Sequence, residues 1–287
     1  MSPPDARAPI GVFDSGVGGL TVVRALRTAL PAERLVYLGD TARLPYGTKS
    51  AETVVRYARR CAEFLLARGA KALVIACNTA SAYALETLER EVAVPVVGVV
   101  RPGAHAAARL SRARRIGVLG THGTIASGAY TRALHDIDPA IQVVGQACPL
   151  LVPLAEEGWL RGPVPELVAN EYLRTFAPGA PGDGADVLVL GCTHYPLLRP
   201  LLQEVATRLA GRPLALVDSA AAVGEAVRQT LFKGGLLAPG SAAGAGAGAD
   251  AGAHEFFLTD TSTRFRELAG TFLGEAVAEV AQVDVGA

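Results

Sequence analysis

The chain has 287 residues, of which half are hydrophobic, and its 27 basic and 27 acidic side chains balance. No basic patch interleaved with aromatic residues is present, which argues against nucleic-acid binding. No apolar run approaches the ~20 residues of a membrane span. Residues 1–9 lack the basic and apolar segments of a signal peptide, so we expect a cytoplasmic protein. The four cysteines show no C-x-x-C spacing, which fits reduced thiols.

The chain alternates between short apolar runs, typical of buried parallel strands, and amphipathic stretches, typical of helices. In the N-terminal part the expected strands are residues 10–13, 35–38, 72–76 and 94–100. The expected helices are residues 20–30, 51–68 and a stretch from about 80. The first strand runs into a glycine-rich turn, D-S-G-V-G-G, and the second ends at Gly39-Asp40. Strands alternating with helices predict parallel sheets with helices on both faces.

The same series of elements begins again after residue 100. Residues 116–119 (I-G-V-L) match residues 10–13 (I-G-V-F) and also run into a hydroxyl- and glycine-rich turn, G-T-H-G-T. The other matches are 141–145 with 35–39, 187–191 with 72–76, and 213–217 with 95–99. Four similar elements in the same order indicate two related α/β halves. We therefore predict two similar doubly wound parallel-sheet domains related by pseudo-symmetry, with an active site in the cleft between them.

A low-complexity segment, P-G-S-A-A-G-A-G-A-G-A-D-A-G-A at residues 239–253, separates the halves from a tail at 256–280. It offers no apolar surface to bury, so we expect a flexible loop without a function of its own. The tail is compatible with either half.

Two of the expected strands end in a cysteine. Residues 72–76 run into Cys77-Asn78-Thr79, and residues 187–191 run into Cys192-Thr193-His194. Ligands of open α/β sheets bind at the carboxyl ends of the strands. Two related halves that face each other would present one thiol to each side of a small molecule. Inversion of a carbon centre by proton removal and return needs such a pair, and the unperturbed thiol pKa of ~8.5 suits it.

Several short polar side chains follow the expected strands and could clamp carboxylates together with the amides of helix N-termini. They are Ser15, Asn78, Thr79, Thr121, Thr124 and Thr193.

Other kinds of site fit less well. A dinucleotide site would use Asp40, at the end of the second strand, as its ribose ligand. Its fingerprint needs a third glycine where Thr21 stands, and the carboxylate of Asp14 would repel a pyrophosphate. A role for Asp14 as a helix N-cap stays open. A metal site built from the two cysteines and His194 has no support from spacing. Pyridoxal phosphate needs a Schiff-base lysine, and Lys49, Lys71 and Lys233 are poorly placed for one.

Three further alternatives remain. A nucleophilic Cys192 with His194 would make a hydrolase or transferase, but leaves Cys77 unexplained. Both cysteines as buried structural residues stay open, as does a bilobal amino-acid-binding protein without catalysis. Cys61 falls on the apolar face of the expected helix 51–68 and fits a plain core residue.

Six motifs taken together resemble the cofactor-independent aspartate/glutamate racemase superfamily, and within it the bacterial glutamate racemases. They are F-D-S-G-V-G-G-L at 13–20, G-D-T-A-R-L-P-Y-G at 39–47, A-C-N-T-A-S at 76–81, G-T-H-G-T at 120–124, V-P-L-A-E-E-G at 152–158 and G-C-T-H-Y-P-L-L at 191–198. The resemblance implies interconversion of L- and D-glutamate for peptidoglycan, with no cofactor and no metal. It leaves aspartate as an alternative substrate, and a homodimer is compatible with it.

The resemblance also implies roles for individual residues. Cys77 and Cys192 would carry the protons, assisted by Asp14 and His194, with Glu156 as a further helper beside Glu157. The residues implied in substrate binding are Asp14, Ser15, Tyr46, Gly47, Asn78, Thr79, Thr121, Thr124, Thr193 and His194. A discontinuous first domain is implied as well, made of residues 1–98 and 212–287, with 99–211 as the second domain.

Overall fold

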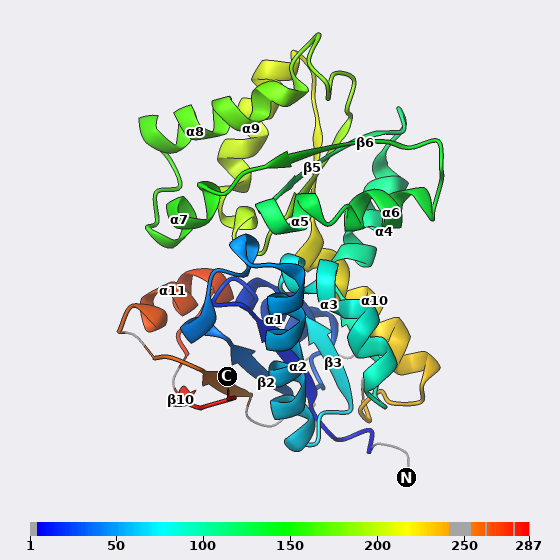
Figure 1. The fold of residues 1–287 in the computed structure, drawn as a ribbon, viewed down its shortest axis with the longest axis vertical. Helices are drawn as coiled ribbons and strands as arrows, with labels where there is room; N and C mark the ends of the chain where they lie inside the picture. Colours follow the sequence, from blue (N-terminus) through cyan, green and yellow to red (C-terminus); the bar gives the residue numbers. More distant parts are fainter. Residues whose placement is uncertain (1–4, 241–253, 262, 278, 287) are drawn as a thin grey trace. The chain divides into compact units, whose positions relative to one another are not determined.

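The computed structural model describes residues 5–240, 254–261, 263–277 and 279–286 (Figure 1). The chain divides into two compact units, residues 1–99 with 220–287 and residues 100–219. Each unit has its own β-sheet, and every strand pair in both sheets is parallel. The expected Gly/Ala loop at 239–253 lies outside the described residues from position 241 onward.

The first unit contains a six-stranded sheet in the order β10-β9-β2-β1-β3-β4. Its strands are β1 (Ile10–Asp14), β2 (Leu35–Gly39), β3 (Ala72–Ile75), β4 (Val96–Gly98), β9 (Glu255–Leu258) and β10 (Ala281–Gln282). Its helices are α1 (Leu20–Ala29), α2 (Ala51–Ala67), α3 (Asn78–Glu91), α10 (Ser219–Lys233) and α11 (Thr263–Leu273), with short 3-10 turns η1 (Thr41–Arg43) and η2 (Tyr46–Thr48). Because β9 pairs with β2, the tail completes this first sheet.

The second unit contains a four-stranded sheet in the order β6-β5-β7-β8. Its strands are β5 (Arg115–Gly120), β6 (Gln142–Ala147), β7 (Val187–Gly191) and β8 (Ala215–Asp218). Its helices are α4 (Val100–Leu110), α5 (His122–Ala126), α6 (Ala129–His135), α7 (Leu151–Glu156), α8 (Pro163–Leu173) and α9 (Arg199–Ala210), with 3-10 turns η3 (Arg174–Phe176) and η4 (Tyr195–Leu198).

The two sheets share one strand order. In each, the second strand of the series lies beside the first, followed by the third and the fourth. The fold class expected from the repeated motifs, two parallel-sheet α/β domains, is therefore confirmed. The boundary between the two units differs from the expected one. Because β8 pairs with β7, residues 215–218 belong to the second sheet. The chain returns to the first unit only after Ser219.

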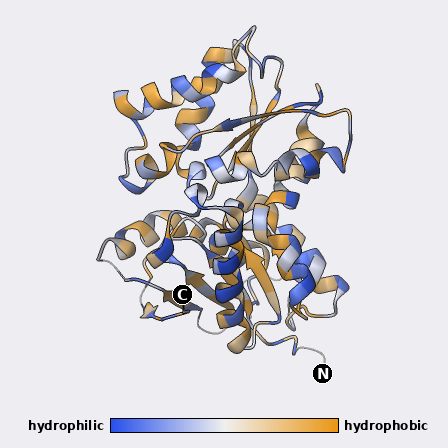
Figure 2. Ribbon diagram, in the orientation of Figure 1, coloured by the Kyte–Doolittle hydropathy of each residue, from blue (hydrophilic) through white to orange (hydrophobic). Residues whose placement is uncertain are grey.

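Burial explains why the strands read as continuous apolar runs. Every residue of β1, β2, β3 and β7 is buried, as expected for parallel strands covered on both sides. Figure 2 shows β3 as hydrophobic, while the helices mix hydrophobic and hydrophilic residues. In α2 the side chain of Ser50 caps the first turn by accepting from the Thr53 N–H at 3.3 Å, and Cys61 lies on the buried face.

A buried ion pair lies at the amino-terminal edge of the first sheet. Lys71 precedes β3 and Glu33 precedes β2, and Lys71 Nζ lies 2.5 Å from Glu33 Oε2. Both side chains are almost completely buried, and Glu33 also accepts from the Ala238 N–H at 2.8 Å. Lys71 therefore has a structural role, at the edge of the sheet opposite to Cys77. Among the described residues, no helix combines the length and apolar character needed to cross a membrane.

Candidate active site

The first unit places Asp14 and Cys77 at one edge of its sheet. Asp14 ends β1, opposite Gly39 at the end of β2, and Phe13 lies opposite Ile75 at the end of β3. Cys77 follows β3 by two residues, so both functional groups occupy the carboxyl edge of neighbouring strands. Ligands of open parallel sheets bind at this edge.

Cys77 forms the N-cap of α3. Its Sγ accepts from the Ala80 N–H at 3.5 Å, and the residue is 7% exposed. The N-terminus of a helix favours negative charge because its amide groups point out of the helix without partners. A thiolate at position 77 would therefore be stabilised by the backbone of α3.

Asp14 is held by the turn that follows it. Its Oδ2 accepts from the Gly16 N–H at 3.1 Å, and the residue is 1% exposed. A Cβ on Gly19 would lie 2.4 Å from the Asp14 Cβ and 3.0 Å from the Ala76 Cβ, so only glycine permits this packing. The carboxylate and the thiol of Cys77 both raise the pKa of Tyr37, after the larger effect of burial. The Tyr37 phenol itself donates to the Gly16 carbonyl at 2.8 Å, in the same turn that holds Asp14.

The other residues expected to bind substrate in this unit lie on the same edge. Asn78 and Thr79 begin α3 and are buried, while Ser15, after β1, is half-buried. Tyr46 and Gly47 belong to η2, which contacts α3. The hydroxyl of Tyr46 donates to a protein carboxylate, which leaves the backbone of this turn as its contribution to a ligand.

The second unit holds a chain of three functional groups. Cys192 follows β7, and its Sγ lies 3.8 Å from Nδ1 of His194. Nε2 of His194 lies 2.9 Å from Oε1 of Glu156 at the end of α7. Of the two adjacent glutamates, Glu156 contacts the imidazole, whereas Glu157 is exposed. The imidazole thus bridges a thiol and a carboxylate.

This arrangement favours a charged imidazole. Burial alone would lower the pKa of His194, but hydrogen bonds to Cys192 and Glu156 outweigh it and raise the pKa to about 10. The ring is therefore protonated at neutral pH and donates from both nitrogens. A protonated ring beside Sγ stabilises a thiolate and can return a proton to it.

We expect Glu156→Gln to lower the pKa of His194 below 10, because the amide can still accept from Nε2 but lacks the negative charge that helps to stabilise the charged ring. In the wild-type protein the imidazolium should persist until the pH rises through about 10. In the variant it should deprotonate at lower pH, toward the unperturbed value of ~6.5. NMR titration of the His194 ring measures both values. An unchanged titration would show that Glu156 does not stabilise the charge.

Three threonine side chains lie at the carboxyl edge of the second sheet. The Thr121 hydroxyl caps α5 by accepting from the Thr124 N–H at 3.2 Å, and the two hydroxyl oxygens lie 3.1 Å apart. Thr124 and Thr193 are buried and Thr121 is half-buried. Thr121 follows β5 and Thr193 follows β7, neighbouring strands whose ends Gly120 and Gly191 lie opposite each other. These side chains therefore line the carboxyl edge of the second sheet.

The remaining cysteines lie in the cores. Burial raises the pKa of Cys61 and of Cys148 well above the ordinary thiol value. Both are buried in the apolar clusters of their own units. Neutral thiols of this kind behave as small hydrophobic side chains. Cys148 directly follows β6, but it is fully buried and its thiol donates to the Gln146 carbonyl at 3.4 Å.

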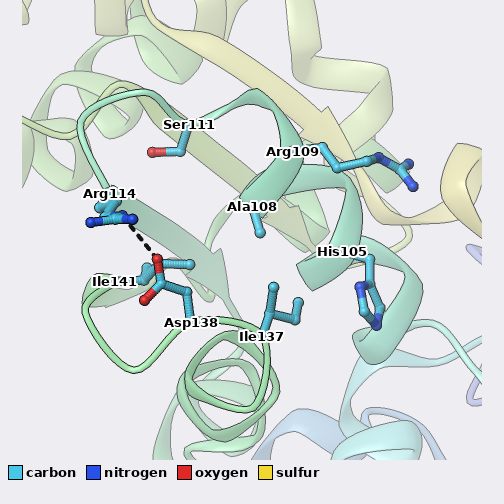
Figure 3. Close-up of a pocket in the computed structure, with 8 residues that line it drawn as sticks. All are labelled: His105, Ala108, Arg109, Ser111, Arg114, Ile137, Asp138 and Ile141. Carbon is cyan, nitrogen blue, oxygen red and sulfur yellow. Dashed lines mark ion pairs between the residues drawn. The ribbon is translucent and has the colours of Figure 1, made fainter.

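A surface pocket in the second unit lies away from these groups. It has a volume of about 330 Å³ and is lined by residues that include Ser111, Arg114 and Ile141, at the amino ends of β5 and β6. Figure 3 shows the Arg114–Asp138 ion pair on one side, with Arg109 directed away from it. The basic groups do not converge on one point. Among the described residues, no group of three or more His, Cys, Asp or Glu side chains is arranged to hold a metal ion.

A family model described as Asp/Glu/Hydantoin racemase matches residues 10–227, and the chain belongs to this family. Its similarity extends over almost the whole chain to particular members. The glutamate racemase of Geobacter metallireducens is 49% identical over 278 residues, covering 97% of each chain. The crystal structure of glutamate racemase from Francisella tularensis in complex with D-glutamate has a TM-score of 0.86 and 35% identity, covering 98% of both chains. That of the Thermus thermophilus glutamate racemase with beta-chloro-D-alanine has a TM-score of 0.82 and 45% identity, covering 97% of this chain and 98% of that one.

Proposed function

We propose that this protein is a glutamate racemase, an isomerase of the cytoplasm that interconverts L- and D-glutamate without a cofactor and supplies D-glutamate for peptidoglycan. The observation that carries the proposal is the matched position of two thiols. Cys77 follows β3 and Cys192 follows β7, the third strands of two sheets with the same strand order. Near-full-length identity of 49% to a glutamate racemase supports glutamate as the substrate.

In the proposed mechanism the two thiols act on opposite faces of one α-carbon. One thiolate removes the α-proton and becomes a thiol, which leaves a carbanion next to the substrate carboxylate. The opposite thiol gives its proton to the other face of that carbon and becomes a thiolate. The configuration is inverted and no electron is gained or lost. The enzyme returns to its starting state when the newly formed thiol gives its proton to solvent and the newly formed thiolate takes one up.

Each thiol has its own assisting group in this proposal. Asp14 serves Cys77 within the first unit, and His194 serves Cys192 at 3.8 Å within the second. Glu156 orients His194 through its contact with Nε2 and keeps the ring charged. Short hydroxyl and amide groups near the strand ends hold the substrate carboxylates; these are Ser15, Asn78, Thr79, Thr121, Thr124 and Thr193, together with the turn at Tyr46-Gly47.

Turnover of L-glutamate and of L-aspartate by the purified protein tests the substrate. We expect D-glutamate to form with a kcat/KM far above that for aspartate. Faster racemisation of aspartate would refute the choice of substrate but not the two-thiol chemistry. A covalent acyl adduct on Cys192 in mass spectra, formed equally well by Cys77→Ala, would instead identify a cysteine hydrolase.

A further inference from the structure

A completely buried carboxylate, Asp40, lies at the carboxyl end of β2, beside the strand that carries Asp14. Its main-chain N–H donates to the Asp14 carbonyl at 2.9 Å. Its carboxylate accepts from Nε of Arg43 at 2.9 and 2.8 Å, from the Thr259 hydroxyl at 3.0 Å and from the Tyr46 hydroxyl. These donors come from η1, from η2 and from the segment after β9. Asp40 therefore joins three segments of the chain at the edge that carries the site.

The donors around Asp40 keep their protons. Burial raises the pKa of Tyr46, and the negative charges of nearby groups, Asp40 among them, raise it further. Burial opposes the charge of Arg43, but the hydrogen bond to Asp40 outweighs it and the pKa of Arg43 is raised. A buried phenol and a half-buried guanidinium need an acceptor, because an unpaired donor removed from water is costly. The conformation of the turn thus depends on the carboxylate.

The Asp40 contacts set the position of η2. The guanidinium of Arg43 lies over the ring of Tyr57 at 4.5 Å, and Tyr57 packs against Tyr46 at 5.6 Å between ring centroids. Tyr46 is 1% exposed and belongs to the same apolar cluster as Cys77. Since η2 contacts α3, the turn is fixed against the helix that begins with Asn78.

We propose that Asp40 is a positioning residue for substrate binding. Through Tyr46 it holds the η2 turn, with Gly47, against the start of α3. This role rests on the proposed function, in which Tyr46 and Gly47 hold glutamate. The carboxylate of Asp40 is occupied by protein donors, so it acts through the turn and does not touch the substrate. The same occupancy excludes a ribose ligand at Asp40, the alternative that a dinucleotide site would require.

Steady-state kinetics of Asp40→Asn test this role. The amide replaces one acceptor oxygen by a donor that faces Arg43 and Tyr46, so the turn should lose its fixed position. We expect KM for glutamate to rise about tenfold with kcat changed much less, because binding alone is weakened. A double-mutant cycle with Tyr46→Phe should be non-additive, since both changes break the same link. An unchanged KM, or strictly additive effects, would overturn the proposal.

Two further variants separate positioning from general loss of stability. Glu33→Gln breaks the buried pair with Lys71 at the opposite edge of the sheet, so it should lower the melting temperature and leave KM unchanged. If Asp40→Asn does not fold, Thr259→Val tests the role instead. It removes one donor to Asp40 and should raise KM severalfold, while an unchanged KM would overturn the role.

A wild-type protein that fails to turn over glutamate would refute the proposed function. Turnover by the wild type with unchanged KM in the variants would refute the positioning role alone.

Discussion

Replacing Cys77 or Cys192 with alanine is expected to lower kcat for glutamate racemisation by about 10³-fold or more, in line with the loss of an essential acid/base group. Each variant keeps one of the two thiols and so can remove a proton from one face without returning one to the other. Racemisation needs both steps in either direction. The loss should therefore be equally severe for L- and D-glutamate, which circular dichroism measures directly.

The other two cysteines provide matched controls. Cys61→Ala in the first unit and Cys148→Ala in the second also remove a buried thiol, but one to which the proposed mechanism assigns no role. Each should lower the melting temperature modestly and leave kcat within a few-fold of the wild type, because core truncations of this size act on stability. Near-wild-type racemisation by Cys77→Ala or Cys192→Ala would contradict the assignment of paired thiols.

His194→Asn and Asp14→Asn are expected to slow opposite directions of the reaction, each by about 10²-fold in kcat, the lower range for loss of acid/base assistance. The reason is that His194 contacts Cys192, whereas Asp14 lies in the other unit with Cys77. Each assisting group supports its thiol most when that thiol removes the proton.

Thermodynamics determines where this asymmetry can appear. The two enantiomers have equal free energy, so kcat/KM must stay equal in the two directions for every variant. The asymmetry must therefore appear in kcat and be balanced by KM. Full progress curves from L- and from D-glutamate give both constants. Equal losses of kcat in both directions for both variants would show that the two groups do not serve separate thiols.

Much of the fold could be predicted because the periodic pattern is local. The repeated motifs at 10–13 and 116–119 predicted two related sheets, and buried parallel strands make such runs continuous. The boundary of the second domain was expected too early in the chain, at residue 211, because it was taken from the family resemblance. The repeat itself matches residues 213–217 with 95–99, and the pairing of β8 with β7 places residues 215–218 in the second sheet.

The candidate site was inferred from residue types and from the family resemblance, and nothing in the sequence indicated the contacts among its residues. The strand-end cysteines stand out because a thiol after a buried strand is chemically conspicuous. The partner of His194 lies 38 residues earlier in the chain, and two adjacent glutamates there look equivalent in sequence. From the sequence, Asp40 was considered only as a ribose ligand, and that role was rejected. Its contacts could not be predicted, because one of its donors, Thr259, is 219 residues away in the chain. Long-range hydrogen bonds of this kind leave no periodic signal.

The most direct test of the two-thiol mechanism is racemisation of L-glutamate in deuterium oxide, sampled at low conversion. If one thiolate removes the α-proton and the opposite thiol returns a hydrogen that has exchanged with solvent, the early D-glutamate carries deuterium at the α-carbon. The remaining L-glutamate should still carry mostly protium, because its face is served by the group that took the proton away. Mass spectrometry of the separated enantiomers measures both. Substantial protium in the early D-glutamate would indicate a single base acting on both faces and would contradict the pairing of Cys77 with Cys192.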